Sequence, residues 1–399
     1  MYGPRATQVS RTLGELARLG WRPMAVCLAP RRGGPHWPNG VAVDVPSGVD
    51  LVRVPSPEEW MAVRAAWRVA PRLRDFPDAT RLWVARATQA AARAAVGGEC
   101  AGLLTFAQPW SDHLVGLRVH RQTRLPWAAH FSDPWADSPY ATPRQRSIWR
   151  RMEEDVVREA AAVVFVTDET ADLVMAKYPD EWRRKVFVVP HGFEARRTGA
   201  TRRSGGQMRV VYTGRFYGGL RTPIPLLRAL ADLNSREPLA GTLEVLFTGP
   251  HVEEFERDAV ALGVASFVRF RGRVPPAEAA SIAAGADVLL VIDAPSSGPS
   301  AFLPSKLIDY LPFRRPILGV TPEPGAAARL LRRLGCPVAP PDDIAAIASS
   351  LAGLMQRWRD GTLDVGASFD SVAAEFDIRT TSRLLHDVLI HAFQGHRQN

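Results

Sequence analysis

The residues most suited to chemistry lie in segment 303–318, which reads LPSKLIDYLPFRRPIL. Pro304 suits the first position of a helix, where the amides that follow have no partner within the helix. Lys306 adds a full positive charge to the partial charge of that helix start, and Asp309 lies one turn further along. Amides and an ammonium suit phosphate, and a carboxylate suits the vicinal hydroxyls of a sugar. We therefore predict a nucleotide-diphosphate site at Ser305, Lys306, Leu307 and Asp309.

A second candidate is segment 213–223, which follows a predicted strand. Gly214 would let the backbone approach a ligand closely, and Arg215 and Arg221 could each bind phosphate through paired hydrogen bonds. A glycine-rich turn with solvated arginines is the alternative. Because Lys306 falls in the same half of the chain, we favour a diphosphate site made by both segments.

A third candidate is segment 270–276, which ends another predicted strand. The main chain at Val274 could pair with the edge of a nucleobase. An ordinary strand-to-helix turn accounts for the same residues equally well, so the nucleobase contact is the least supported part of the predicted nucleotide site.

In the first half, segment 130–135 reads HFSDPW and also ends a predicted strand. His130 and Asp133 could bind substrate hydroxyls or move a proton. The alternatives are a plain turn at Asp133, which precedes Pro134, and a buried core histidine at position 130. His191, before Gly192, fits a hinge better than a catalyst.

These candidates follow strands that alternate with helices along the chain, a pattern typical of parallel sheets covered by helices. At 399 residues the chain is long for one core. We predict an α/β protein with two Rossmann-like domains facing a cleft, at 1–191 and 208–370, joined by a polar linker at 192–207. A helix within 371–399 is expected to cross back to the first domain. Strands are predicted at 24–28, 51–54, 101–106, 127–131, 163–167, 186–190, 208–213, 243–247, 268–271, 288–292 and 316–320.

The first domain differs from a complete doubly wound half. Residues 1–7 look like the loop that follows a first strand, but no strand precedes them. Either the true start lies upstream or a central strand is missing. We favour the former, because losing a central strand would expose the edges of its neighbours.

Composition narrows the function classes. The chain has a net charge of +9 carried almost wholly by arginine, and only three cysteines without metal-binding spacing. No apolar run is long enough to span a bilayer and no secretory signal opens the chain, so we expect a cytoplasmic protein. The charge fits phosphate-rich partners or a general compositional bias towards arginine.

Region 58–89 interleaves Trp60, Trp67 and Trp83 with six arginines. Trp60 and Trp67 are seven residues apart and so share a helical face. A basic, aromatic helix of this kind could lie on the inner face of an anionic membrane. We favour the alternative, a core-facing tryptophan pair with solvated arginines.

The order of these segments resembles family 4 (group 1) retaining glycosyltransferases. The resemblance rests on Thr213-Gly-Arg, Phe270-Arg-Gly-Arg-Val, the strand at 286–292 and Pro304-Ser-Lys-Leu-Ile-Asp-Tyr-Leu. In the first half, 6–21, 133–135 and 186–193 also have counterparts. The similarity implies a glycosyltransferase-B fold, a nucleotide-sugar donor, no metal or other cofactor, and a glycan, lipid-linked or small-molecule acceptor, with no nucleic acid as partner.

By matching position, Arg215 and Lys306 would bind the diphosphate with the amides of Ser305 and Lys306, and Asp309 would hold the ribose where the family usually has Glu. Arg221 would be a displaced equivalent of the family's second basic residue. The family's upstream acid would fall at Ala301, where no acid is present. Recognition of the sugar must therefore differ, with Ser297, Ser300 and backbone amides as candidates.

The resemblance implies transfer with retained anomeric configuration, in which the leaving phosphate takes the acceptor proton. Domain closure would exclude water. Two rivals remain: a catalytically silent homologue that binds sugars or partners, motivated by Ala301, and a nucleotide-sugar epimerase on the same fold.

Overall fold

The computed structural model describes residues 4–29, 44–69, 76–96, 100–195, 206–216, 219–296 and 298–394. The chain divides into two compact units. The first unit consists of the chain up to Gly192 together with the chain from Ile378 onwards. The second unit runs from Phe193 to Asp377. Most of the predicted linker lies outside the described residues. No helix among the described residues combines the length and hydropathy needed to cross a bilayer.

Unit 1 contains two parallel sheets. One pairs β1 (Met24–Leu28) with β2 (Asp50–Val54). The other has the order β3-β4-β5-β6, formed by β3 (Leu103–Ala107), β4 (Trp127–Phe131), β5 (Ala162–Phe165) and β6 (Val186–Val188). Every residue of β4 and β5 is buried, as expected for parallel strands covered on both faces. Within the described residues no strand joins β1 to β3.

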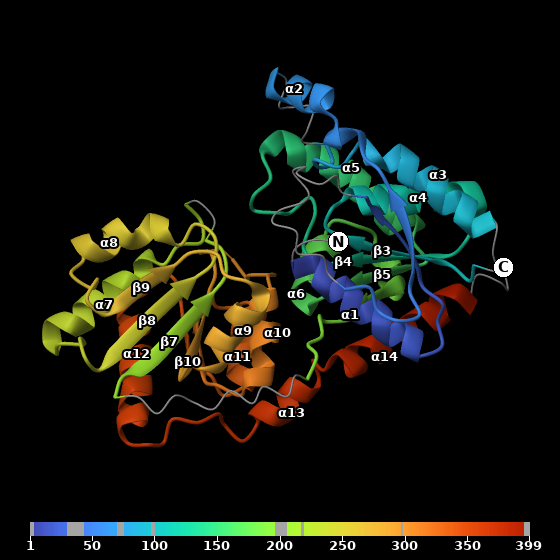
Figure 1. Ribbon diagram of the computed structural model, residues 1–399. Helices are drawn as coiled ribbons and strands as arrows, with labels where there is room; N and C mark the ends of the chain where they lie inside the picture. Colours follow the sequence, from blue (N-terminus) through green and yellow to red (C-terminus); the bar gives the residue numbers. More distant parts are fainter. Residues whose placement is uncertain are drawn as a thin grey trace. The chain divides into compact units, whose positions relative to one another are not determined.

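Helices cover both sides of these strands. They are α1 (Pro4–Arg18), α3 (Trp83–Val96), α4 (Ser111–Thr123), α5 (Pro143–Glu159), α6 (Asp168–Met175) and α14 (Ile378–Gln394), with 3₁₀ turns η1 (Pro57–Glu59) and η3 (Asp180–Lys185). Figure 1 shows α14 beside α1, and both pack on β4 and β5 through Leu13, Leu385 and Ala128. Trp21 adds a hydrogen bond of 2.9 Å to Nδ1 of His386. The end of the chain therefore completes the first unit.

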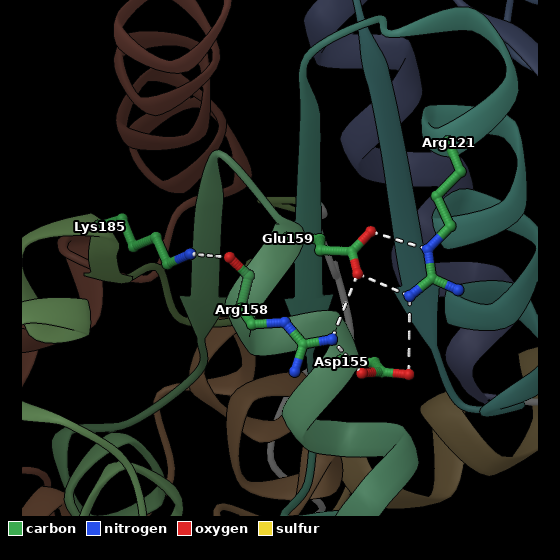
Figure 2. A network of polar contacts seen from close by, with 5 residues as sticks. All are labelled: Arg121, Asp155, Arg158, Glu159 and Lys185. Atoms are coloured by element: carbon green, nitrogen blue, oxygen red, sulfur yellow. Dashed lines mark hydrogen bonds and ion pairs between the residues drawn. The ribbon is translucent and has the colours of Figure 1, made fainter.

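A polar network fixes the carboxyl end of α5 (Figure 2). Arg121 of α4 donates two hydrogen bonds to the Glu159 carboxylate, at 2.8 and 2.6 Å. Lys185 of η3 donates to the carbonyl oxygens of Arg158 and Ala160 at 2.7 and 3.0 Å. Because Arg121 is about half exposed, its ion pair sets geometry more than it adds stability.

Helix α2 (Met61–Val69) corrects one prediction. None of its residues is buried, and Trp60, just before it, is 50% exposed. The favoured interpretation of Trp60 and Trp67 as a core-facing pair is therefore wrong, with Trp67 half-buried rather than in the core. Trp83 of α3 supplies the buried aromatic ring here instead, at 5% exposure.

Unit 2 is a six-stranded parallel sheet in the order β12-β11-β10-β7-β8-β9. Its strands are β7 (Met208–Thr213), β8 (Leu243–Thr248), β9 (Val268–Arg271), β10 (Val288–Ile292), β11 (Ile317–Val320) and β12 (Val338–Ala339). From β7 the chain proceeds outward through β8 and β9, and then returns to β10 on the other side of β7. That reversal is the topological switch point of a doubly wound sheet.

Two layers of helices enclose this sheet (Figure 1). One layer holds α7 (Ile224–Arg236) and α12 (Ile344–Arg359), and α8 (Glu256–Ala261) with η4 (Glu253–Phe255) lies near the β9 edge. The other holds α9 (Pro276–Ala284), α10 (Ser305–Tyr310), η5 (Leu311–Phe313), α11 (Ala326–Arg333) and α13 (Phe369–Ala374). Each layer has its own apolar core, so central strands such as β10 and β11 are buried on both faces.

The predicted segment 371–399 is divided between the units. Phe369, Val372 and Phe376 belong to the core of unit 2, where the amide of Phe193 donates to the Phe376 carbonyl at 2.9 Å. The helix that packs in unit 1 begins only at Ile378. The boundary therefore lies later than predicted, because apolar side chains hold residues 371–377 in unit 2.

Candidate functional site

The candidate site of unit 2 lies at the carboxyl ends of β7 and β10, on either side of the switch point. Ligands of open α/β sheets bind in the crevice outside such strand ends. Gly214 follows β7 and Asp293 follows β10. Of the residues predicted from the sequence, the structure brings Gly214, Arg221 and Lys306 to this place.

Lys306 occupies the first turn of α10, and its ammonium is buried. The Nζ atom lies 3.7 Å from the centroid of the Tyr212 ring, in cation–π geometry, and finds no hydrogen-bond partner among the described residues. The residue as a whole is half-buried, so the part of Lys306 that solvent reaches is not its ammonium. This leaves a buried donor whose hydrogen bonds an anion could complete.

Glycine at position 214 makes room for this ammonium. A Cβ built on Gly214 would lie 2.5 Å from Lys306 Nζ, and φ is +149°. The neighbouring strand end needs a glycine too, since a Cβ on Gly249 would lie 2.0 Å from the Gly214 carbonyl oxygen. The amide of Gly214 donates to the Thr248 carbonyl at 2.8 Å, which fixes this close backbone approach.

Burial lowers the pKa of Lys306 well below its ordinary value of 10.5. The Arg221 guanidinium lowers this pKa further, and the Asp293 carboxylate opposes the shift. An anion that reached Nζ would favour the charged form and raise the pKa again. Binding of an anion would therefore add a favourable charge interaction with the Lys306 ammonium.

Arg221 already has a carboxylate partner. Its Nη2 lies 2.6 Å from Asp293 Oδ1, and the two side chains are 14% and 4% exposed. The amide of Ala294 also donates to this oxygen, at 3.0 Å. Asp293 was not predicted from the sequence, because it lies 72 positions from Arg221 and follows an otherwise apolar strand.

Tyr310 anchors α10 to the end of β7. The Thr213 amide donates to the Tyr310 hydroxyl at 2.9 Å, and burial raises the pKa of Tyr310 to about 12. Leu307 and Ile308 are buried in the core beneath the helix. These contacts hold Lys306 in place while its ammonium points at Tyr212.

The remaining predicted residues differ in their exposure and in the hydrogen bonds that they make. Arg215 is exposed, and its carbonyl accepts a hydrogen bond of 3.0 Å from the Tyr212 hydroxyl. Ser305 and Asp309 are half-buried on α10. Leu307 is a core residue whose amide donates to the Pro304 carbonyl at 2.9 Å.

Val274 is half-buried and packs against the core beneath α9 and α10. Ala301, at the position of the missing acid, is 4% exposed, and Ser300 is 5% exposed with its amide bonded to the Pro324 carbonyl. Ser297 lies outside the described residues. Recognition of a sugar by Ser300 would therefore need its side-chain hydroxyl rather than its amide.

A second polar site lies in unit 1 at the end of β4. His130 is 3% exposed, and its Nδ1 lies 3.2 Å from Nη2 of Arg5 on α1. Burial, together with the Arg5 charge, lowers the pKa of His130 well below its ordinary range. A guanidinium can only donate, so Nδ1 of His130 accepts the hydrogen bond from Arg5. The neutral His130 ring therefore carries its proton on Nε2, which is a donor. This geometry suits binding of a hydroxyl better than removal of its proton.

Arg5 and its surroundings were not predicted from the sequence. Arg5 is half-buried, its Nε atom is buried without a partner among the described residues, and desolvation lowers its pKa to about 10. Arg5, His130 and His191 line a polar cavity of about 10 Å³, the size of one water molecule. The His191 ring lies 6.0 Å from that of His130, so this residue belongs to the cluster as well as to the hinge predicted for it.

Asp133 is half-buried on the loop that follows β4, and Gln108 Nε2 lies 3.4 Å from its Oδ2. Trp135 stacks on Trp110 with centroids 5.0 Å apart, which fixes the same loop. Glu153, fully buried, accepts a hydrogen bond of 2.9 Å from the Ala136 amide. Asp133 is thus held on an ordered turn rather than a mobile one.

No family model and no curated protein sequence matches this chain. Among solved structures, it is similar to a sucrose-phosphate synthase from Thermosynechococcus elongatus at 16% identity and a TM-score of 0.62, covering 98% of this chain and 92% of that one. The apo structure of OtsA matches at 11% identity and a TM-score of 0.65, covering 98% and 97%. WaaG, described as a glycosyltransferase involved in lipopolysaccharide biosynthesis, matches at 15% and 0.56, covering 98% and 96%.

Identities this low establish the fold alone. The two units, each with a parallel sheet covered by helices, confirm the predicted α/β class and the glycosyltransferase-B fold. Assignment to family 4 remains a prediction, as do the roles of the site residues.

Proposed function

We propose that this protein is a metal-independent, retaining glycosyltransferase that takes a sugar from a nucleoside-diphosphate donor. The observation that carries the proposal is the buried Lys306 ammonium at the switch point, beside a glycine that leaves space for it. The fold supports it, because the similar structures include WaaG, itself described as a glycosyltransferase.

In this proposal Lys306 and Arg215 bind the diphosphate, with the Ser305 amide and the backbone at Gly214 close to it. Their charge offsets the negative charge that develops as the bond from the anomeric carbon to the phosphate oxygen breaks. A new bond forms from the same carbon to the acceptor oxygen, and the leaving phosphate accepts the hydroxyl proton. Asp309 holds the ribose, and Val274 lies near the base.

Arg221 acts differently from Arg215 in this scheme. Asp293 offsets the charge of Arg221, so we expect Arg221 to contribute less to diphosphate binding than Arg215. In unit 1, His130 and Asp133 would bind hydroxyls of donor or acceptor. Among the described residues no three His, Cys, Asp or Glu side chains come together as metal ligands. Independence of a metal ion is itself part of the proposal.

The test combines binding and turnover. Purified protein is screened by thermal shift against the common nucleoside diphosphates and their sugars, and the right donor should raise the melting temperature by mass action. Lys306→Ala should lower release of the diphosphate from that donor by about 10²–10³-fold, the usual cost of removing one such charge interaction. Arg257→Gln, at an exposed position of α8, is the control. Unchanged turnover in Lys306→Ala would refute the site assignment.

A second candidate is a catalytically silent sugar-binding homologue, and the buried Ala301 favours it, since no carboxylate is present there to contact the sugar. Binding of a nucleotide sugar with no transfer or hydrolysis would support this alternative. Conversion of the bound sugar to an isomer without an acceptor would instead indicate an epimerase.

A further inference from the structure

Within the described part of the chain, nothing covers helix α2 enough to bury any of its residues. None of its residues is buried, and Met61 and Val69 are 80% and 89% exposed. In Figure 1 the helix stands apart from the sheets of unit 1. Isolated helices of this length are marginal in water and usually depend on packing of one face. A surface that covers α2 in the functioning protein would supply that packing.

The neighbouring outward face of α3 continues this surface. Arg86 of α3 lies over the Trp60 ring, with its guanidinium carbon 5.1 Å from the ring centroid. A shallow groove of about 750 Å³ runs along α3 past Arg86, Gln89, Arg93 and Val96. We call the combined surface the basic face and define it by Trp60, Met61, Arg64, Arg68, Arg86 and Arg93.

Charge on the basic face has one sign. The sequences of α2 and α3 contain four arginines and no acidic residue. Two glutamates, Glu58 and Glu59, precede Trp60 in the sequence. Glu58 is fully buried and accepts a hydrogen bond from the Trp83 amide at 3.3 Å. The Glu58 carboxylate therefore points into unit 1 rather than towards the arginines at the surface.

We propose that the basic face docks on the headgroup region of an anionic lipid bilayer. Arginine guanidinium groups would contact lipid phosphates, while Trp60 and Met61 enter the interface, where tryptophan and other apolar side chains of amphipathic helices are favoured. The single sign of charge selects this partner over a protein surface of mixed charge. This inference concerns unit 1 alone and holds whether or not the chain transfers sugars.

The test is co-sedimentation with vesicles of equal parts phosphatidylglycerol and phosphatidylcholine, compared with phosphatidylcholine alone. The full chain should bind the anionic vesicles and lose binding as salt is raised. The pair Arg64→Gln/Arg68→Gln should weaken binding about thirtyfold, since each arginine near the surface contributes about 1 kcal/mol. The control pair Arg228→Gln/Arg257→Gln removes the same charge from exposed positions of unit 2 and should leave binding unchanged.

A second variant tests the apolar part. Trp60→Ser/Met61→Ser should weaken vesicle binding, whereas Val260→Ser, at an exposed position of α8, should not. Hydrogen exchange in residues 61–69 should slow on anionic vesicles, because docking stabilises the helix. Equal binding to neutral vesicles, no binding of the wild-type chain, or equal loss in both arginine pairs would overturn the proposal. So would a dimer that Trp60→Ser/Met61→Ser converts to monomer, since the basic face would then cover a second copy.

Discussion

Replacing Lys306 with methionine should affect ligand binding and folding stability in opposite directions. Methionine has similar length and keeps a favourable sulfur contact with the Tyr212 ring, which the Lys306 ammonium now faces at 3.7 Å. The substitution removes a buried charged group that has no hydrogen-bond partner among the described residues. We expect the variant without ligand to be more stable than the wild type and unable to bind a nucleoside diphosphate.

The magnitude follows from two opposing contributions. A buried polar group without a partner costs about 1–3 kcal/mol, and more when charged. Loss of a desolvated cation–π contact costs up to about 2 kcal/mol, of which the sulfur–aromatic contact restores about 1. Because the group is charged, the upper part of the first range applies, and the net expectation is roughly 1–2 kcal/mol of added stability in unit 2. For a unit of this size that raises the melting temperature by about 2–8 °C.

The pH dependence of this difference has a definite sign. The pKa of Lys306 is lowered in the folded protein, so between that pKa and the ordinary value the unfolded chain binds the extra proton. Stability of the wild type therefore rises with pH in this window through this group. The advantage of the methionine variant should shrink as the pH is raised from 7 towards 10.

Differential scanning calorimetry, with and without the nucleoside diphosphate that stabilises the wild type, measures both effects. Ligand at a hundred times its dissociation constant should add about 2.7 kcal/mol to the wild type and nothing to Lys306→Met. Lys185→Met is the matched control, because this lysine donates to two carbonyl oxygens and its loss should destabilise the protein. A destabilised Lys306→Met protein that still responds to the ligand would refute the reasoning.

Three further predictions concern both units. Gly249→Ala should lower the free energy of unfolding of unit 2 by about 2 kcal/mol or more in urea titrations, because its Cβ would lie 2.0 Å from the Gly214 carbonyl oxygen and φ is +142°. Burial lowers the pKa of His113 to about 3, so His113→Gln should make stability fall less steeply between pH 6.5 and 4, and parallel slopes would contradict this. Asp293→Asn should cost about 3 kcal/mol in thermal unfolding by leaving Arg221 without its buried carboxylate, whereas an unchanged melting temperature would show that the pair contributes nothing.

The strands were predictable where both faces are buried. The predicted bounds 127–131, 208–213 and 288–292 match β4, β7 and β10, because a short apolar run bounded by polar residues is typical of a strand covered on both sides. Strand β12 was missed, since two residues at a sheet edge leave no pattern. The fold class followed from the alternation of such strands with helices.

The candidate site was predictable only in part. Gly214 and Lys306 could be placed together because each follows a strand end in one doubly wound sheet. The pairing of Arg221 with Asp293, and of Arg5 with His130, could not, because partners 72 and 125 positions apart share no local pattern. Side-chain exposure was equally hidden: the spacing of Trp60 and Trp67 showed a shared face but not whether that face meets the core.

The lysines of the chain supply an internal comparison. Only three of its 50 basic residues are lysines: Lys177, Lys185 and Lys306. Lys177 pairs with the buried Glu153 carboxylate at 2.5 Å, and Lys185 is satisfied by two carbonyl oxygens. These two have the partners that a buried ammonium requires for folding. The Nζ atom of Lys306 is also buried, but among the described residues it has no hydrogen-bond partner and lies over the Tyr212 ring. Folding alone would be served better by an apolar side chain at position 306, and the anionic ligand that we propose would complete the contacts of this ammonium.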